Sequence, residues 1–160
     1  MPTTSEIRLG QLLGLPVILE GRMVGRIERA VITPDGECLR GVMLRRGLGG
    51  AKWASRDHIE VLGEVSVILK HPPTRVPKDA DFAFHGVRDT GGMALGWVTD
   101  AYLHTGSFRL TALEVSLGLM EELRGGRYLA RKWSVTPETG EVLIPCGCAL
   151  EKRQQLSARR

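Results

Sequence analysis

Glycine and other turn-forming residues interrupt this chain at short intervals, and runs of Val, Ile and Leu fill the spaces between them. The 20 Gly and 8 Pro leave few stretches in which a long helix could form. Short apolar runs bounded by turn residues are typical of antiparallel strands. We therefore predict an all-β fold for these 160 residues.

The first half is predicted to contain strands over residues 17–19, 23–33, 39–45, 58–62 and 65–69. Pro34-Asp35-Gly36 predicts a tight turn between two of them. Pro fixes its own φ, the Asp side chain caps the turn, and Gly accepts a positive φ.

The second half repeats the first. Gly25 and Gly96 align at a separation of 71, and the same separation aligns Ala30 with Ala101, Leu39 with Leu110 and Val42 with Leu113. Lys52-Trp53 and Lys132-Trp133 align at 80, and the segments 63–68 and 140–145 align at 77. The separation changes because the second copy is expected to carry extra residues near 119–130. Similarity at this period predicts duplication of a folding unit.

Each copy has the strands for a small closed barrel. Five or six short strands bury an apolar face best by curling up, which removes most of the open edges. Gly25, Gly41 and Gly96 lie inside apolar strands, where glycine is typical of bends and bulges.

The predicted domain boundary is a segment with three prolines and alternating charges, which favours a stiff, extended linker. We predict a first barrel over residues 1–70, this linker over 71–83, a second and divergent barrel over 84–146, and a basic C-terminal tail over 147–160.

The segment LLGLPVILEGRMVGRIERAVITPDGECLRGVML (12–44), followed by AKWASRDHIEVLGEVSVIL (51–69), resembles the PRC-barrel family. These small β-barrels occur in the photosynthetic reaction-centre H subunit, in a bacterial ribosome maturation factor and in stand-alone bacterial proteins, some with two barrels. Residues 84–145 resemble the family weakly, since they lack the early Pro and carry an insertion. The resemblance implies two tandem small antiparallel PRC-like β-barrels. It implies adaptor roles and no shared catalytic residues.

Composition narrows the class of protein. No apolar run reaches the roughly 20 residues of a membrane-spanning helix, and the N-terminus lacks the features of a secretory signal. We predict a cytoplasmic protein without a transmembrane segment. Three cysteines, Cys38, Cys146 and Cys148, argue against a disulfide scaffold, and the Cys-Gly-Cys spacing is too short for a usual zinc site. No metal and no cofactor are predicted.

No reactive constellation is evident. The spacing of the four histidines places no two of them on one helix or strand face beside a carboxylate; they are His58, His71, His85 and His104. The Gly-rich segment RRGLGGAK, which begins at Arg45 and Arg46, could hold phosphate in a turn, but it lacks the Gly-Lys-Ser/Thr end of a nucleotide-binding loop, and a flexible hairpin is the favoured reading. We predict that the chain is not an enzyme.

The chain has a formal net charge of +4, and its strongest signal for binding is a basic stretch in the second half. Arg124, Arg127, Arg131 and Lys132 have no acidic residue between them, and Tyr128 and Trp133 are interleaved. Basic residues contact phosphates and aromatic rings stack on unpaired bases, so RNA is one reading. A solvated face with a basic tail is the other.

Three functions remain. The first is a non-enzymatic adaptor that binds an unidentified protein partner through the barrels and the 119–131 insertion. The second is an RNA- or ribosome-associated factor that uses the basic stretch and the tail. The third is a peripheral subunit of a membrane electron-transport complex, which rests on the reaction-centre relative alone. Self-association into a homo-oligomer is a further expectation.

Overall fold

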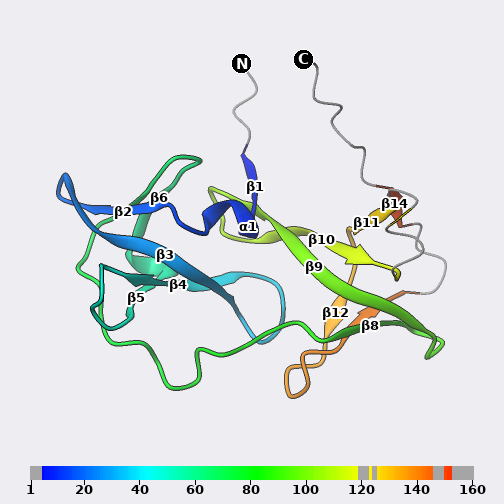
Figure 1. Ribbon diagram of the computed structural model, residues 1–160. Coiled ribbons are helices and arrows are strands. Elements are labelled where there is room, and N and C mark those ends of the chain that lie inside the picture. The colour runs from blue at the N-terminus through cyan, green and yellow to red at the C-terminus, as the bar shows by residue number, and fades with distance from the viewer. Residues whose placement is uncertain (1–4, 119–122, 124–125, 146–149, 153–160) are drawn as a thin grey trace, which may run out of the picture.

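Two β-sheets make up nearly all of the regular secondary structure in the computed structural model of this protein (Figure 1). The structure describes residues 5–118, 123, 126–145 and 150–152. Its helical elements include α1 (Leu9–Leu12) and the 3-10 turn η1 (Arg56–His58). The predicted all-β fold is confirmed.

The first sheet has the strand order β5-β4-β3-β2-β7-β6. Its strands are β2 (Pro16–Leu19), β3 (Arg22–Ile32), β4 (Leu39–Arg45), β5 (Lys52–Ser55), β6 (Ile59–Leu62) and β7 (Val67–Leu69). The edge strands β5 and β6 are consecutive in the chain, and η1 alone joins them. Three residues cannot span a flat six-stranded sheet, so the sheet curls and its two edges approach each other.

The second sheet has the order β12-β13-β8-β9-β10-β11-β14, and β1 pairs separately with β9. Its strands are β1 (Glu6–Arg8), β8 (Gly86–Asp89), β9 (Ala94–His104), β10 (Leu110–Ser116), β11 (Arg127–Ala130), β12 (Ser134–Val135), β13 (Val142–Ile144) and β14 (Glu151–Lys152). Residues 131–133 alone connect β11 to β12, so this sheet curls in the same way.

The two sheets repeat one strand order and one register. The succession β5-β4-β3-β2-β7-β6 corresponds to β11-β10-β9-β8-β13-β12. Every residue pair between β3 and β4 reappears between β9 and β10 when 71 is added to both numbers; Ile32–Leu39, for example, becomes Leu103–Leu110. The two register shifts in these ladders also coincide. The predicted internal repeat is therefore confirmed in the backbone.

Gly25 and Gly96 occupy equivalent places beside register shifts, as predicted for bulge positions. A Cβ on Gly96 would lie 1.8 Å from the carbonyl oxygen of Ser116, and one on Gly25 would lie 3.0 Å from that of Arg45. Both sites require glycine because a neighbouring strand passes too close for a side chain.

Two predicted alignments within the repeat are wrong. In the sheets, Lys52-Trp53 corresponds to Tyr128-Leu129, at a separation of 76, and not to Lys132-Trp133. Strand β7 corresponds to β13 at a separation of 75, not 77. Counted between equivalent paired positions, the segment from β10 to β11 is five residues longer than its counterpart, whereas the segment from β11 to β12 is three residues shorter. An insertion followed by a deletion cannot be located by comparing apolar residues within a single sequence.

The expectation of purely antiparallel sheets is also wrong. β2 pairs with β7 in parallel, and β8 pairs with β13 in parallel at the equivalent place. A parallel pair needs a long connection between its strands, and here β3 to β6 supply it. Local turn signals predict hairpins and carry no information about such distant pairings.

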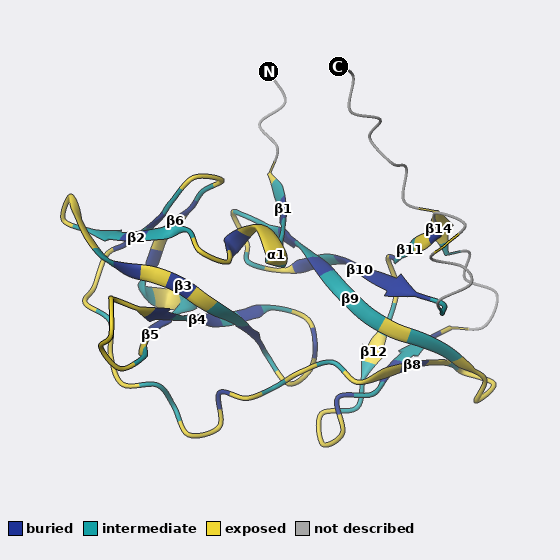
Figure 2. Ribbon diagram, viewed as in Figure 1, coloured by how far each residue is buried: buried dark blue, intermediate teal, exposed yellow. Residues whose placement is uncertain are grey.

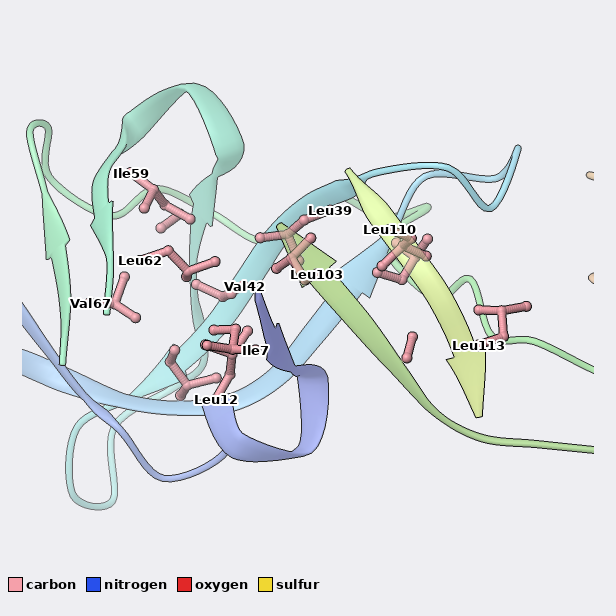
Figure 3. Close-up of a cluster of buried hydrophobic side chains, with 14 of the residues drawn as sticks. Ile7, Leu12, Leu39, Val42, Ile59, Leu62, Val67, Leu103, Leu110 and Leu113 are labelled. Atoms are coloured by element: carbon pink, nitrogen blue, oxygen red, sulfur yellow. The ribbon is translucent and has the colours of Figure 1, made fainter. Parts of the chain in front are cut away.

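One hydrophobic cluster extends through both sheets. Figure 3 shows this run of side chains from Ile59 and Leu62 in the first sheet to Leu110 and Leu113 in the second. Leu39 and Leu103 are fully buried within it. The two sheets therefore share a core. Figure 2 shows that β10 is buried along most of its length, whereas exposed residues concentrate in the turns.

The sheets meet where their equivalent hairpin turns pair with each other. The Leu39 N–H donates to the Phe108 carbonyl at 2.8 Å, and the Leu110 N–H donates to the Glu37 carbonyl at 2.8 Å. Leu39 and Leu110 are 71 residues apart, and so are Glu37 and Phe108. Exchanging the two copies of the repeat therefore converts each of these hydrogen bonds into the other.

Cys38 and Arg109 lie between these two hydrogen bonds and form an antiparallel bridge with each other. They too are 71 residues apart. Reciprocal contacts between equivalent residues are the signature of a two-fold interface. The two copies thus pack around a pseudo-two-fold axis, as the subunits of a homodimer would. We call this junction the seam.

Two further segments pack on the sheets: the N-terminal strand β1 and residues 71–83. β1 belongs to the N-terminal arm but pairs with β9 of the second sheet. Residues 71–83 run against the first sheet, where Thr74 pairs with Trp53 and Ala80 is buried against Trp53 and Val31. Arg40 holds Asp79 through an ion pair of 2.9 Å. The domain division at residues 70 and 83 stays a prediction.

Candidate anion-binding hollow at the seam

A hollow of about 330 Å³ opens beside the seam. Three cationic side chains line it: Arg109 from the β9–β10 turn, and Arg131 and Lys132 from the connection between β11 and β12. The rest of its wall is formed by Glu37, Thr90, Leu110, Trp133, Ser134, Leu143 and Pro145. Both copies of the repeat therefore contribute to one basic site.

The corresponding corner of the first sheet is bridged by two contacts. There the Lys70 N–H donates to the His58 carbonyl at 2.9 Å, and the ring of His71 packs edge-on against that of His58 at 5.1 Å. The residue equivalent to Lys70, at the separation of 75 found for β7 and β13, is Pro145. Proline has no N–H, so the closing bond cannot form in the second sheet.

The connection on the other side of the hollow is shortened. Three residues, 131–133, separate the paired positions Ala130 and Ser134. Six residues, 55–60, separate the equivalent positions Ala54 and Val61. The shorter connection holds Arg131 and Lys132 beside the seam.

Trp133 anchors this connection across the seam. Its indole N–H donates to the Gly36 carbonyl at 3.2 Å, and its ring packs at the margin of the shared core. Gly36 has a φ of 73° and would place a Cβ 2.3 Å from Cγ2 of Val135. The turn of the first copy thus fits against β12 of the second only because residue 36 is glycine.

The three cations differ in how firmly they are already paired. Arg109 lies 3.7 Å from Glu37, and Arg131 lies 3.3 Å from Glu151. All four of these side chains are at least half exposed. Within the described residues, no carboxylate lies within 4.0 Å of Lys132, which is also exposed. Weak, exposed pairs of this kind contribute about 0–1 kcal/mol, so they can be replaced by a ligand.

The structure brings only part of the predicted basic stretch into the hollow. Arg131 and Lys132 line it, whereas Arg127 forms an ion pair of 2.9 Å with the fully buried Glu114. Thr99 also donates to that carboxylate at 3.0 Å. Arg127 therefore has a structural partner. Tyr128 lies next to it on β11, opposite Val115.

The other predicted residues lie away from this site or outside the described residues. Arg45 forms a two-pronged contact with Glu28, with distances of 2.9 and 3.4 Å. Arg46 is exposed in the β4–β5 turn. Residues 119–122 and 124–125 of the insertion, Cys146, Cys148 and the tail residues 147–149 and 153–160 fall outside the described residues, and Arg124 is among them.

Sequence reasoning missed Arg109, Glu37 and Thr90, which come from distant turns. A signal for Arg109 existed, because it stands in the repeated turn at a separation of 71 from Cys38. Its importance depends on the two turns meeting, and no local pattern encodes that meeting.

Acid–base groups are scattered over the described part of the molecule. His71 lies against His58, and the described residues contain no group of three or more His, Cys, Asp or Glu able to hold a metal ion. The pKa of Asp35 is lowered, first by a hydrogen bond from the Thr33 hydroxyl and then by the Glu37 N–H. The pKa of Asp79 is lowered by its hydrogen bond from Arg40.

No protein-family model matches the chain, and no curated protein matches it. Among the described residues, no helix has the length and apolar character needed to span a membrane.

Proposed function

We propose that this chain is a non-enzymatic adaptor made of two tandem PRC-like β-barrels, and that it docks an acidic segment of a protein partner at the hollow beside the seam. The observation that carries this proposal is the convergence of Arg109, Arg131 and Lys132 on one hollow that both copies of the repeat build. Cations with weak internal partners can exchange them for the carboxylates or phosphates of another molecule.

The barrel assignment is supported by the short connections between edge strands. In the first sheet three residues join the edge strands β5 and β6, and in the second three residues join β11 and β12, with β14 pairing outside β11. Connections this short favour strongly curled sheets, which leave fewer exposed edges. A rigid body of this kind offers a fixed surface for docking.

The test is affinity capture from the native cell with the wild-type protein, a Lys132→Glu/Arg131→Glu variant and the control Arg46→Glu. Arg46 is an exposed cation in the first sheet, so its reversal changes the net charge without touching the hollow. We expect the wild-type protein to capture a protein partner that stays bound after nuclease treatment. The Arg46→Glu control should capture the same partner, and the double variant should not. A partner captured equally by all three proteins would contradict the proposal.

An RNA- or ribosome-associated role is the second candidate. It is favoured by the exposed Lys132 next to Trp133, since a cation beside an aromatic ring suits unpaired nucleotides. Loss of the captured material after nuclease treatment, together with a steep dependence on salt, would select this function.

A further inference from the structure

We propose that the hollow beside the seam recognises a phosphate monoester dianion carried by the bound molecule. This inference rests on the proposed docking function and names the group that docks. The three cations come from two directions, with Arg109 on one wall and Arg131 and Lys132 on another. A phosphate monoester presents three acceptor oxygens and a charge of about −1.5 to −2 at pH 7, so it can bridge walls that a single contact could not.

The carboxylates already at the site favour a dianion over a monoanion. Glu37 faces Arg109 at 3.7 Å and Glu151 faces Arg131 at 3.3 Å. An incoming carboxylate would only replace one internal carboxylate by another of equal charge. A dianion gains more from the same guanidinium groups and also engages Lys132, which has no carboxylate partner in the described part of the chain.

The shape of the charge distribution favours one isolated phosphate over a polymer. The hollow, at about 330 Å³, lies at the small end of the range of about 300–1,000 Å³ for ligand sites. Arg127, the neighbouring cation of the predicted basic stretch, is held by the buried Glu114 carboxylate. A nucleic-acid strand requires a groove of cations that follows its backbone.

The experiment is isothermal titration calorimetry of the full chain with four probes. They are inorganic phosphate, adenosine monophosphate, a phosphoserine peptide and dimethyl phosphate, which is a monoanion at every relevant pH. The variants are Lys132→Ala and Arg109→Ala, with Arg46→Ala as the matched control. Circular dichroism confirms that each variant is folded.

We expect millimolar or tighter binding of at least one monoester, a loss of about tenfold in affinity for each hollow cation removed, and no change for Arg46→Ala. Binding should weaken as the pH falls through about 6, where the phosphate takes up its second proton. Preference for the peptide identifies a phosphorylated protein as the source, and preference for the nucleotide identifies a free mononucleotide.

The inference is overturned if no monoester binds, if dimethyl phosphate binds as well as the monoesters, or if Lys132→Ala and Arg109→Ala bind like the wild type. If the phosphate inference fails, the adaptor function still holds provided that affinity capture yields a nuclease-resistant protein partner that the Lys132→Glu/Arg131→Glu variant does not bind. The two failures are therefore distinguishable.

Discussion

The same corner of the fold is bridged by a backbone hydrogen bond in the first sheet and is hollow in the second. In the first sheet six residues separate the paired positions Ala54 and Val61, the ring of His58 among them packs against His71, and the Lys70 N–H donates to the His58 carbonyl. In the second, Pro145 replaces Lys70, and three residues separate the equivalent positions Ala130 and Ser134. A register conserved pair by pair shows that the backbone plan is common to both copies. The difference shows that one copy of a repeated fold can form a hollow where a backbone N–H is missing and the adjoining connection is shorter.

The first test of this comparison truncates core side chains at equivalent positions of the two copies. Ile32→Ala and Leu103→Ala remove buried side chains 71 residues apart. Because both belong to one cluster, each should lower the free energy of unfolding by about 2–5 kcal/mol. Urea unfolding followed by circular dichroism and by tryptophan fluorescence measures the loss.

A shared core also requires that both variants unfold in a single transition. Two transitions, with only the mutated half affected, would show that the sheets are stabilised separately.

The second test compares an ion pair of each half. Arg127→Ala removes one charged partner of the buried Glu114 carboxylate, which keeps the hydrogen bond from Thr99, and should cost about 1–3 kcal/mol of stability. Arg45→Ala breaks the exposed pair with Glu28 and should cost about 0–1 kcal/mol. Thermal unfolding of the two variants side by side gives the difference.

Replacing both partners sharpens this result. Met43 stands in the first sheet where Glu114 stands in the second, and Ala51 stands where Arg127 does, so Glu114→Met/Arg127→Ala imitates the first copy. We expect it to recover much of the loss, since an apolar pair can substitute for a buried ion pair. A double variant less stable than Arg127→Ala argues against a purely structural role for this pair.

The third test addresses the seam. Gly36→Ala places a Cβ against Val135 and strains a positive φ, and should cost about 1 kcal/mol or more. Ser107 is the equivalent residue of the second copy and is exposed, so Ser107→Ala should change stability by about 0.5 kcal/mol or less. Equal effects at the two positions, measured by urea unfolding, would mean that the seam is less tightly fitted than described.

The smallest effect concerns pH. The folded-state pKa of Asp35 lies below its ordinary value of 3.8, because Thr33 and the Glu37 N–H bind the carboxylate. A depressed pKa adds stability above the unfolded value, and that stability is lost as the pH falls through the folded value. The second copy has Gly106 at the equivalent place. Asp35→Asn should flatten the decline in unfolding free energy below about pH 4, whereas an unchanged slope would assign the decline to other carboxylates.

Part of this fold could be read from local patterns. The predicted strand over residues 39–45 matches β4 at both ends, and the turn at Pro34-Asp35-Gly36 lies where expected, because turn chemistry acts over a few residues. β5 was not predicted, since its four residues show no clear alternation. The parallel pairs were missed because they join strands distant in the chain.

The candidate site was only half predictable for a related reason. Arg131 and Lys132 stand out as adjacent charges, and both line the hollow. Arg127 belongs to the same run, yet its position on β11 directs it to Glu114. Adjacent charges reveal where cations are frequent, but strand register decides which of them share a surface.

The sequence by itself determined short strands, their turns and the fact that one unit occurs twice, because strand and turn preferences act between near neighbours. Tertiary structure alone decided that equivalent turns pair around Cys38 and Arg109, and that Arg109 reaches the same hollow as Lys132. These contacts join residues far apart in the chain, and the shared apolar core fixes them.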